Sequence, residues 1–166
     1  MSNFKVKVAA NGDREVVIRR SFNATKKLVF QAHTECKYLK RWMFGPDGWS
    51  LDVCEIDLKV GGKYRWVWKK DEIEMGAGGE YREISSPDRL IATERFDHPW
   101  YPGEAISTVT FDDAGGVTTV TNTMQYESKE ARDIVLQSPM EEGLALGYDR
   151  LEALLAESAQ AAGHGE

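Results

Sequence analysis

The chain has 166 residues, of which 42% are hydrophobic and 29% are charged, enough for one domain with its own core and too few for two. Its 21 Lys and Arg stand against 27 Asp and Glu, a net charge of -6 that leaves no basic surplus for nucleic acid. No stretch approaches the roughly 20 apolar residues that span a bilayer, and residues 1–10 interleave lysines with apolar residues, unlike a signal peptide. We therefore expect a soluble, cytoplasmic protein that binds neither nucleic acid nor membranes.

The first half of the chain changes its hydrophobic period twice. Apolar and polar residues alternate over 4–8 and again over 14–22, which predicts a strand pair around the Asn11-Gly12 turn. From residue 23 the apolar residues recur at three- and four-residue steps, which predicts two short helices broken near Thr34. Alternation returns over residues 51–126 and predicts five or six antiparallel strands.

The last part of the chain is helical in its pattern. A short helix should open at Ser128, and a long amphipathic helix should follow from about Pro139 to Glu157, with Ser138 as its N-cap. We therefore predict an α+β fold in which a curved antiparallel sheet of six to seven strands wraps around the long helix. Residues 1–157 should form a single domain, and residues 158–166, rich in Ala and Gly, a flexible tail.

Two cysteines and three histidines are the residues with the greatest potential for metal or redox chemistry. Cys36 and Cys54 lack a metal-ligand spacing and are too few for a disulfide framework, so we interpret them as reduced, half-buried core residues. The histidines form no metal pair, and phosphate or dinucleotide motifs are absent from the sequence. We expect no metal and no cofactor.

A helix covering part of a curved sheet readily leaves a space beneath it, and the aromatic residues gather where that space should be. Two glycines also lie four residues apart inside the long helix, and each costs about 0.5 to 1 kcal/mol relative to Ala in a helix interior. This cost indicates that something large approaches the backbone of the helix there. The candidate lining residues are Trp42, Trp49, Trp66, Trp68, Tyr81, Phe96 and Trp100, the strand residues Asn122 and Met124, and the helix residues Met140, Gly143, Leu144 and Gly147.

Each of these features also has a purely structural explanation. The rings can simply fill a core, the glycines can make room for a packed aromatic ring, and Asn122 can be satisfied by a backbone partner or water. An enzymatic alternative would use Asp97 with His98, or Glu55 or Glu94, as acid and base on a substrate in the pocket. The sequence has no pattern that identifies a catalytic residue.

Several segments in the same order resemble proteins related to the activator of the 90-kDa heat-shock-protein ATPase, within the START-like SRPBCC superfamily. The most recognisable stretch is residues 54–65, Cys-Glu-Ile-Asp-Leu-Lys-Val-Gly-Gly-Lys-Tyr-Arg. The other matching segments are residues 24–34, 39–42, 44–49, 79–84, 87–93, 140–143 and 148–151. The resemblance covers roughly residues 15–155 and implies the helix-grip fold.

The resemblance implies one fold but several possible functions, because helix-grip proteins include lipid carriers, ligand sensors, cyclases and co-chaperones. We expect a binding module for a hydrophobic or aromatic small molecule. The alternatives are a co-chaperone or other interaction protein, with a chaperone or a second copy of the chain as its partner, and an enzyme acting on a pocket-bound substrate. The heat-shock activator joins such a domain to a chaperone-binding domain, for which this length leaves no room.

Overall fold

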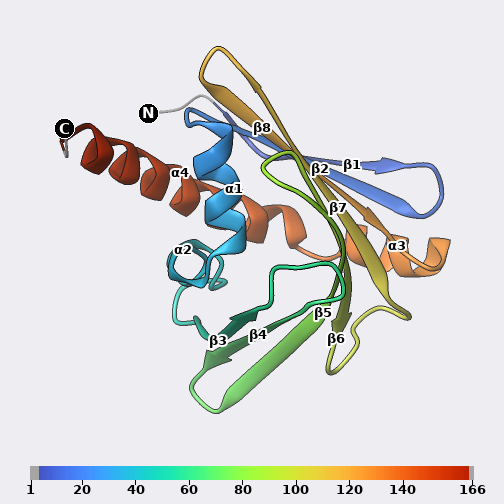
Figure 1. Cartoon of the computed structure of the whole chain (residues 1–166). Coiled ribbons are helices and arrows are strands. Elements are labelled where there is room, and N and C mark those ends of the chain that lie inside the picture. Colours follow the sequence, from blue (N-terminus) through green and yellow to red (C-terminus); the bar gives the residue numbers. More distant parts are fainter. Residues whose placement is uncertain (1–3, 165–166) are drawn as a thin grey trace.

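A computed structural model describes residues 4–164, with side chains through residue 159. Eight antiparallel strands form one curved sheet in the order β1-β2-β8-β7-β6-β5-β4-β3 (Figure 1). The strands are β1 (Lys7–Asn11), β2 (Glu15–Phe22), β3 (Ser50–Ile56), β4 (Lys63–Lys70), β5 (Ile73–Ser85), β6 (Arg89–Phe96), β7 (Ala105–Ala114) and β8 (Val117–Gln125). The predicted α+β class is confirmed, with one or two strands more than expected.

Two strands contain an extra residue that shifts their pairing. In β3 the register with β4 changes between Leu51 and Val53, which leaves Asp52 as the additional residue. A second shift lies in β5, between Tyr81 and Glu83, opposite β6. Such bulges increase the bend and twist of a sheet, and the sheet curves to form a concave face.

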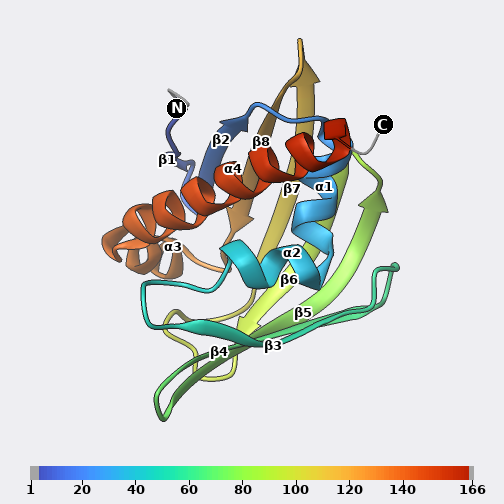
Figure 2. The ribbon, with the colours of Figure 1, turned by 90° about the vertical axis from the view of Figure 1, so that its left-hand side faces the viewer.

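Two short helices connect β2 to β3, as the change of period predicted. Thr25 is the N-cap of helix α1 (Lys26–Thr34), and its side chain accepts a hydrogen bond from the backbone N–H of Leu28. The backbone of Glu35 is extended, which ends α1 and separates it from α2 (Cys36–Trp42). Helix α2 lies between α4 and β3, and α1 packs against α2, α4 and β7 (Figure 2).

The chain closes with α3 (Lys129–Gln137) and the long α4 (Met140–His164), which crosses the concave face of the sheet (Figure 2). Leu151, Leu154 and Leu155 of α4 are buried in the main core. Arg20 of β2 is buried as well, and its guanidinium reaches Asp149 of α4 at 3.3 Å. Apolar packing and this ion pair together hold the helix against the sheet. Within the described residues, no helix combines the length and apolarity needed to cross a membrane.

The two ends of α4 differ from the prediction. Ser138 does not cap α4: it ends α3, and its hydroxyl donates to the carbonyl of Val135. The hydroxyl bonds to α3 and not to α4 because α3 stops directly before α4 begins. At the other end, α4 continues past Glu157 to His164, since its final turns are rich in alanine, the best helix former.

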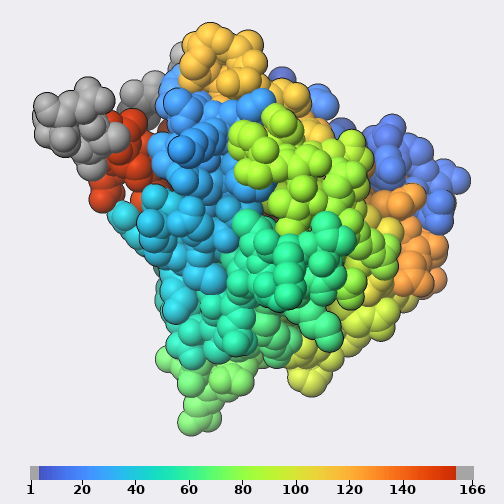
Figure 3. All heavy atoms as spheres, viewed as in Figure 1, coloured from blue at the N-terminus to red at the C-terminus, as the bar shows by residue number. Residues whose placement is uncertain are grey.

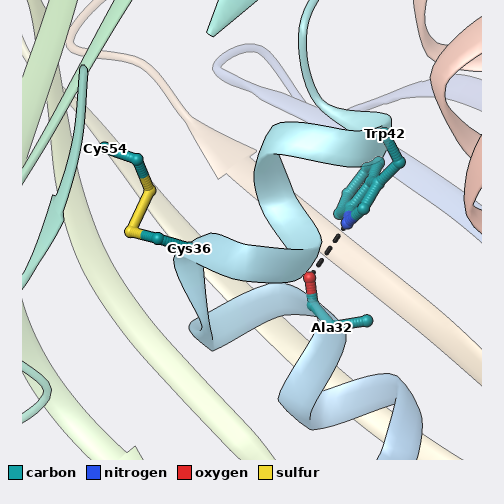
Figure 4. The surroundings of a disulfide bond; sticks show 4 residues. All are labelled: Ala32, Cys36, Trp42 and Cys54. Atoms are coloured by element: carbon teal, nitrogen blue, oxygen red, sulfur yellow. Dashed lines mark hydrogen bonds between the residues drawn. A yellow bond between two sulfur atoms is a disulfide. The ribbon is translucent and has the colours of Figure 1, made fainter. Parts of the chain in front are cut away.

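The interpretation of the cysteines as a reduced pair is wrong in this structure, which contains a disulfide between Cys36 and Cys54. Cys36 is the first residue of α2 and Cys54 lies in β3, with their Cα atoms 5.8 Å apart (Figure 4). The bridge thus joins α2 to an edge of the sheet and closes a loop that includes residues 43–49. Sequence spacing alone could not indicate this pairing, because it depends on α2 folding back onto β3.

Candidate ligand-binding site

A pocket of about 450 Å³ lies between α4, the end of α2 and the concave face of the sheet, and we call it the central pocket. Side chains from β2, β4, β6 and β8 form its floor and sides, and α4 passes over it. The walls combine indole rings with methionine and leucine side chains. Ten of the predicted lining residues border it: Trp42, Trp66, Trp68, Trp100, Asn122, Met124, Met140, Gly143, Leu144 and Gly147.

Two other predicted residues, Trp49 and Phe96, do not border the central pocket. Both line a neighbouring pocket of about 390 Å³, which shares Gly45 and Trp68 with the central one. Phe96 also borders a third pocket, of about 480 Å³, together with Trp100. The hairpin between β4 and β5, which helps to form both outer pockets, projects from the lower end of the molecule (Figure 3).

Tyr81, which the sequence placed among the lining residues, does not border the central pocket. Tyr81 packs instead against Tyr64 at a ring distance of 5.6 Å, in a separate small cluster with Ala92. The alternation of β5 places Tyr81 on the inner face, but far along the strand, behind Tyr64 and Trp66. Alternation identifies the face of a strand and not how far along that face the pocket extends.

Backbone hydrogen bonds fix two of the tryptophans in the wall. The Nε1–H of Trp42 donates to the carbonyl of Ala32 at 2.9 Å (Figure 4), and that of Trp68 donates to the carbonyl of Met43 at 2.9 Å. Trp42 also stacks on Tyr148 of α4, with 5.8 Å between ring centroids. Because the polar N–H of each indole is occupied, the rings present carbon surface to the pocket.

Glu94 of β6 is the acidic residue among those that line the central pocket, and that lining contains no Lys or Arg. The hydroxyl of Tyr101 donates to its Oε1 at 3.1 Å. Burial raises the pKa of the Glu94 carboxyl, and the Tyr101 hydrogen bond opposes that rise. The sequence analysis named Glu94 only as an alternative acid or base, and the structure places it on the inner face with Leu90 and Ala92.

Asn122 and Tyr126 add further polar atoms to the wall. The hydroxyl of Ser107 donates to Asn122 Oδ1 at 2.8 Å, which leaves the amide Nδ2 without a partner in the described part of the chain. The Tyr126 hydroxyl likewise has no partner among residues 4–159. Within residues 4–159, His33 Nε2 is the fully buried side-chain nitrogen or oxygen atom that lacks a hydrogen-bond partner. The Asn122 amide nitrogen and the Tyr126 hydroxyl are therefore not fully buried, and they border open space.

His33 of α1 also lines the pocket, which sequence reasoning missed. Its Nδ1 lies 2.7 Å from the carbonyl of Val29, an arrangement that requires Nδ1 to carry the proton. Burial lowers the pKa of His33 to about 4, so the ring is neutral near pH 7. Its Nε2 is then a hydrogen-bond acceptor, and Trp42 and Phe111 pack edge-on to the ring.

The two helix glycines have different surroundings. A Cβ atom built on Gly143 meets nothing within 4 Å, whereas one on Gly147 lies 3.5 Å from the carbonyl oxygen of Trp42. Gly143 borders open space, and a Cβ on Gly147 would make ordinary van der Waals contact with Trp42. The packing around either position therefore leaves room for a methyl group.

The acid-base candidates fall in different environments. Asp97 forms a two-pronged ion pair with Arg65, with oxygen-nitrogen distances of 2.6 and 2.5 Å, and this pairing occupies the carboxylate proposed to act with His98. Glu55 is exposed on β3. Of these groups, Glu94 is the one that lines the central pocket.

The remaining lining residues were not predicted, and only some had a usable signal. Ile18 and Tyr126 lie on the apolar face of their alternating segments, and Tyr148 belongs to the apolar stripe of the long helix. The other three come from the segment after α2 or from the short helix α3, where the sequence shows no sign of a pocket: Met43, Gly45 and Val135.

A curved antiparallel sheet closed around one long helix, with a pocket between them, defines a helix-grip protein of the START-like class. Residues 23–156 match the family described as Activator of Hsp90 ATPase homolog 1-like protein. The chain belongs to this family, and the resemblance inferred from its motifs is confirmed. Among curated proteins, no relative matches.

Solved structures of bacterial proteins have the same fold. One, from Rhodobacter sphaeroides, is 28% identical, with a TM-score of 0.87 over 92% of this chain and 99% of that one. Protein NE0264 from Nitrosomonas europaea is 23% identical, with a TM-score of 0.78 over 91% and 99% of the two chains. Protein Ms6760 from Mycobacterium smegmatis is 23% identical, with a TM-score of 0.79 over 90% and 96%. The last two similarities concern the fold alone.

Proposed function

We propose that this protein binds a hydrophobic or aromatic small molecule in the central pocket, between α4 and the sheet. The observation that carries the proposal is a pocket of about 450 Å³ whose walls are largely aromatic and aliphatic side chains. Ligand pockets typically have about 300–1,000 Å³, and close-packed cores contain few voids larger than a water molecule. A space of this size inside a small protein is therefore better explained by a ligand than by packing.

The polar atoms of the wall support the same proposal. A binding pocket needs a few donors and acceptors to orient its ligand. Asn122 offers amide N–H groups, Glu94 a carboxyl and Tyr126 a hydroxyl, each bordering the space between apolar rings. Ser107 and Tyr101 hold Asn122 and Glu94 in place, so these groups are preorganised.

A thermal-shift and calorimetric titration with small aromatic probes such as indole, naphthalene and their derivatives tests the proposal. A ligand at 100 times its dissociation constant stabilises the folded state by about 2.7 kcal/mol. For a chain of this size that corresponds to a rise in melting temperature of roughly 5–11 °C. Mass spectrometry of the purified protein under native conditions tests in parallel for a molecule retained from the cell.

Two leucine variants on α4 provide a matched comparison. Gly143→Leu adds a side chain where the pocket has open space and should weaken binding, whereas Ala156→Leu adds the same side chain at an exposed position outside the pocket and should not. Equal binding by both variants, or no stabilisation of the parent by any aromatic probe, would contradict the proposal.

A co-chaperone role is the second candidate, and family membership is the observation in its favour. It predicts that adding the protein raises the ATPase rate of a 90-kDa heat-shock protein in a purified assay. Stimulation that persists in the Gly143→Leu variant would indicate a role independent of the pocket. An unchanged ATPase rate would contradict the co-chaperone role and leave the binding proposal intact.

A further inference from the structure

Glu94 is an acid without a basic partner. Among the described residues it forms no ion pair, and the central pocket, which it lines, is bordered by no Lys or Arg. Its one protein hydrogen bond comes from the uncharged hydroxyl of Tyr101. His33, the other titratable nitrogen group of the wall, is held neutral near pH 7 by burial, which lowers its pKa to about 4. The protein itself thus supplies no positive charge at this position.

A buried carboxylate without a cation costs free energy, because protein atoms replace its water shell without returning an equal interaction. A bound cation offsets this cost, because its charge attracts the carboxylate in a medium that screens weakly. A positively charged hydrogen-bond donor also makes a shorter and stronger bond to a carboxylate than a neutral donor does. Glu94 therefore favours ligands that carry a positive charge.

The aromatic wall favours the same charge. Trp66, Trp68 and Trp100 line the pocket with Glu94 and Tyr126. The face of an indole ring attracts cations, and enclosures of several aromatic rings are used to bind alkylated ammonium groups. The net charge of -6 adds a long-range attraction for cations.

Anionic ligands meet the opposite conditions. A carboxylate group of a fatty acid or an aromatic acid would find no Lys or Arg in the lining and would be repelled by Glu94 when both are ionised. Neutral ligands escape this repulsion, but they gain only an ordinary hydrogen bond.

From these observations, and resting on the proposed binding function, we infer that the central pocket selects amines. The apolar or aromatic body of the ligand lies among the tryptophan rings, and its ammonium group donates to the carboxylate of Glu94. Asn122 and the hydroxyl of Tyr126 border the same space and fix the orientation of the ligand.

Three probes with the same indole body separate charge from shape. Tryptamine ends in an ammonium group, indole-3-ethanol in a hydroxyl and indole-3-acetate in a carboxylate. Isothermal titration calorimetry at low ionic strength should rank their affinities in that order, with tryptamine at least about tenfold tighter than the alcohol. Measurements at low salt matter because screening weakens charge effects near the opening of the pocket.

Two glutamine variants assign the preference to one carboxyl group. Glu94→Gln keeps the size of the side chain and an oxygen that can accept from Tyr101, and it should reduce the preference for tryptamine over the alcohol to about threefold or less. Glu55→Gln removes the same charge from the exposed face of β3 and should leave the preference unchanged. Circular dichroism checks that each variant is folded.

The outcomes distinguish this inference from the function on which it rests. If all three probes bind with similar affinity, or if the alcohol or the acid binds best, the amine inference is wrong and the binding function stands. If no aromatic probe of any charge binds, both are wrong. Should Glu94→Gln fail to fold, the ranking of the three probes on the unaltered protein decides.

Discussion

Gly143, an exposed residue of α4 that borders the central pocket, permits a test of the open space next to it. A Cβ atom added there meets no atom within 4 Å, so Gly143→Ala introduces no clash and replaces a poor helix former with the best one. The expected gain is about 0.5 to 1 kcal/mol. For a chain of this size the melting temperature should rise by roughly 1–4 °C.

A second glycine gives the opposite result with the same chemical change. At Gly79 of β5, a Cβ atom would lie 1.9 Å from the carbonyl oxygen of Thr93 on β6, a backbone atom that cannot move without disturbing the strand pairing. Gly79→Ala should therefore destabilise the fold by about 1–3 kcal/mol or more, as overpacking does in a filled core.

Circular dichroism melting curves of both variants, without ligand, give the comparison. A fall in melting temperature for Gly143→Ala would refute the reasoning, because it would mean that atoms already occupy the space next to α4. The pocket would then be smaller than described, and the case for a bound small molecule would weaken with it.

Three other perturbations test individual interactions. Reduction of the disulfide between Cys36 and Cys54, 18 residues apart, should remove about 3 kcal/mol of stability by the loop-entropy relation, and a thiol assay should detect the two new thiols only after reduction. His33 has a pKa of about 4 in the folded chain against 6.5 when exposed, so stability should be full above pH 6.5 and fall by roughly 3 kcal/mol as the pH drops to 4. Urea unfolding should show a smaller loss in this pH range for His33→Gln. The raised pKa of Glu94 gives the opposite pH dependence: its stabilising contribution is present at acid pH and is lost as the pH rises through the folded-state pKa. Glu94→Gln should therefore be at least as stable as the parent at pH 8 in the absence of ligand.

The sequence predicted much of the fold because hydrophobic period and turn residues are local properties. The break near Thr34 is one example, since the pattern of α1 stops where the extended Glu35 begins. The start of α3 is another, because Ser128 is a favourable N-cap and its hydroxyl accepts from the N–H of Ala131. Ser138 shows the limit of such reasoning. Its sequence context is also typical of an N-cap, but it is the C-cap residue of α3 and its hydroxyl donates to the carbonyl of Val135.

Features that depend on pairs of distant elements could not be predicted in this way. The disulfide requires α2 to lie against β3. The position of Tyr81 beside Tyr64 depends on the lengths and registers of β4, β5 and β6. Glu94 was ambiguous for a related reason, because a register error of one residue moves a side chain to the other face of the sheet.

The bulge at Asp52 also bears on how copies of this chain can associate. The sheet is open, and its two edge strands are β3 and the five-residue β1. Unpaired edges invite strand addition by another molecule, and proteins resist it with bulges, short strands and charged side chains. Asp52 and the exposed Glu55 supply a bulge and charges at one edge, and the short β1 begins with Lys7 at the other. We therefore expect a homodimer of this chain to be built on its helices or on the outer face of the sheet, and not on a sheet that continues from one copy into the next.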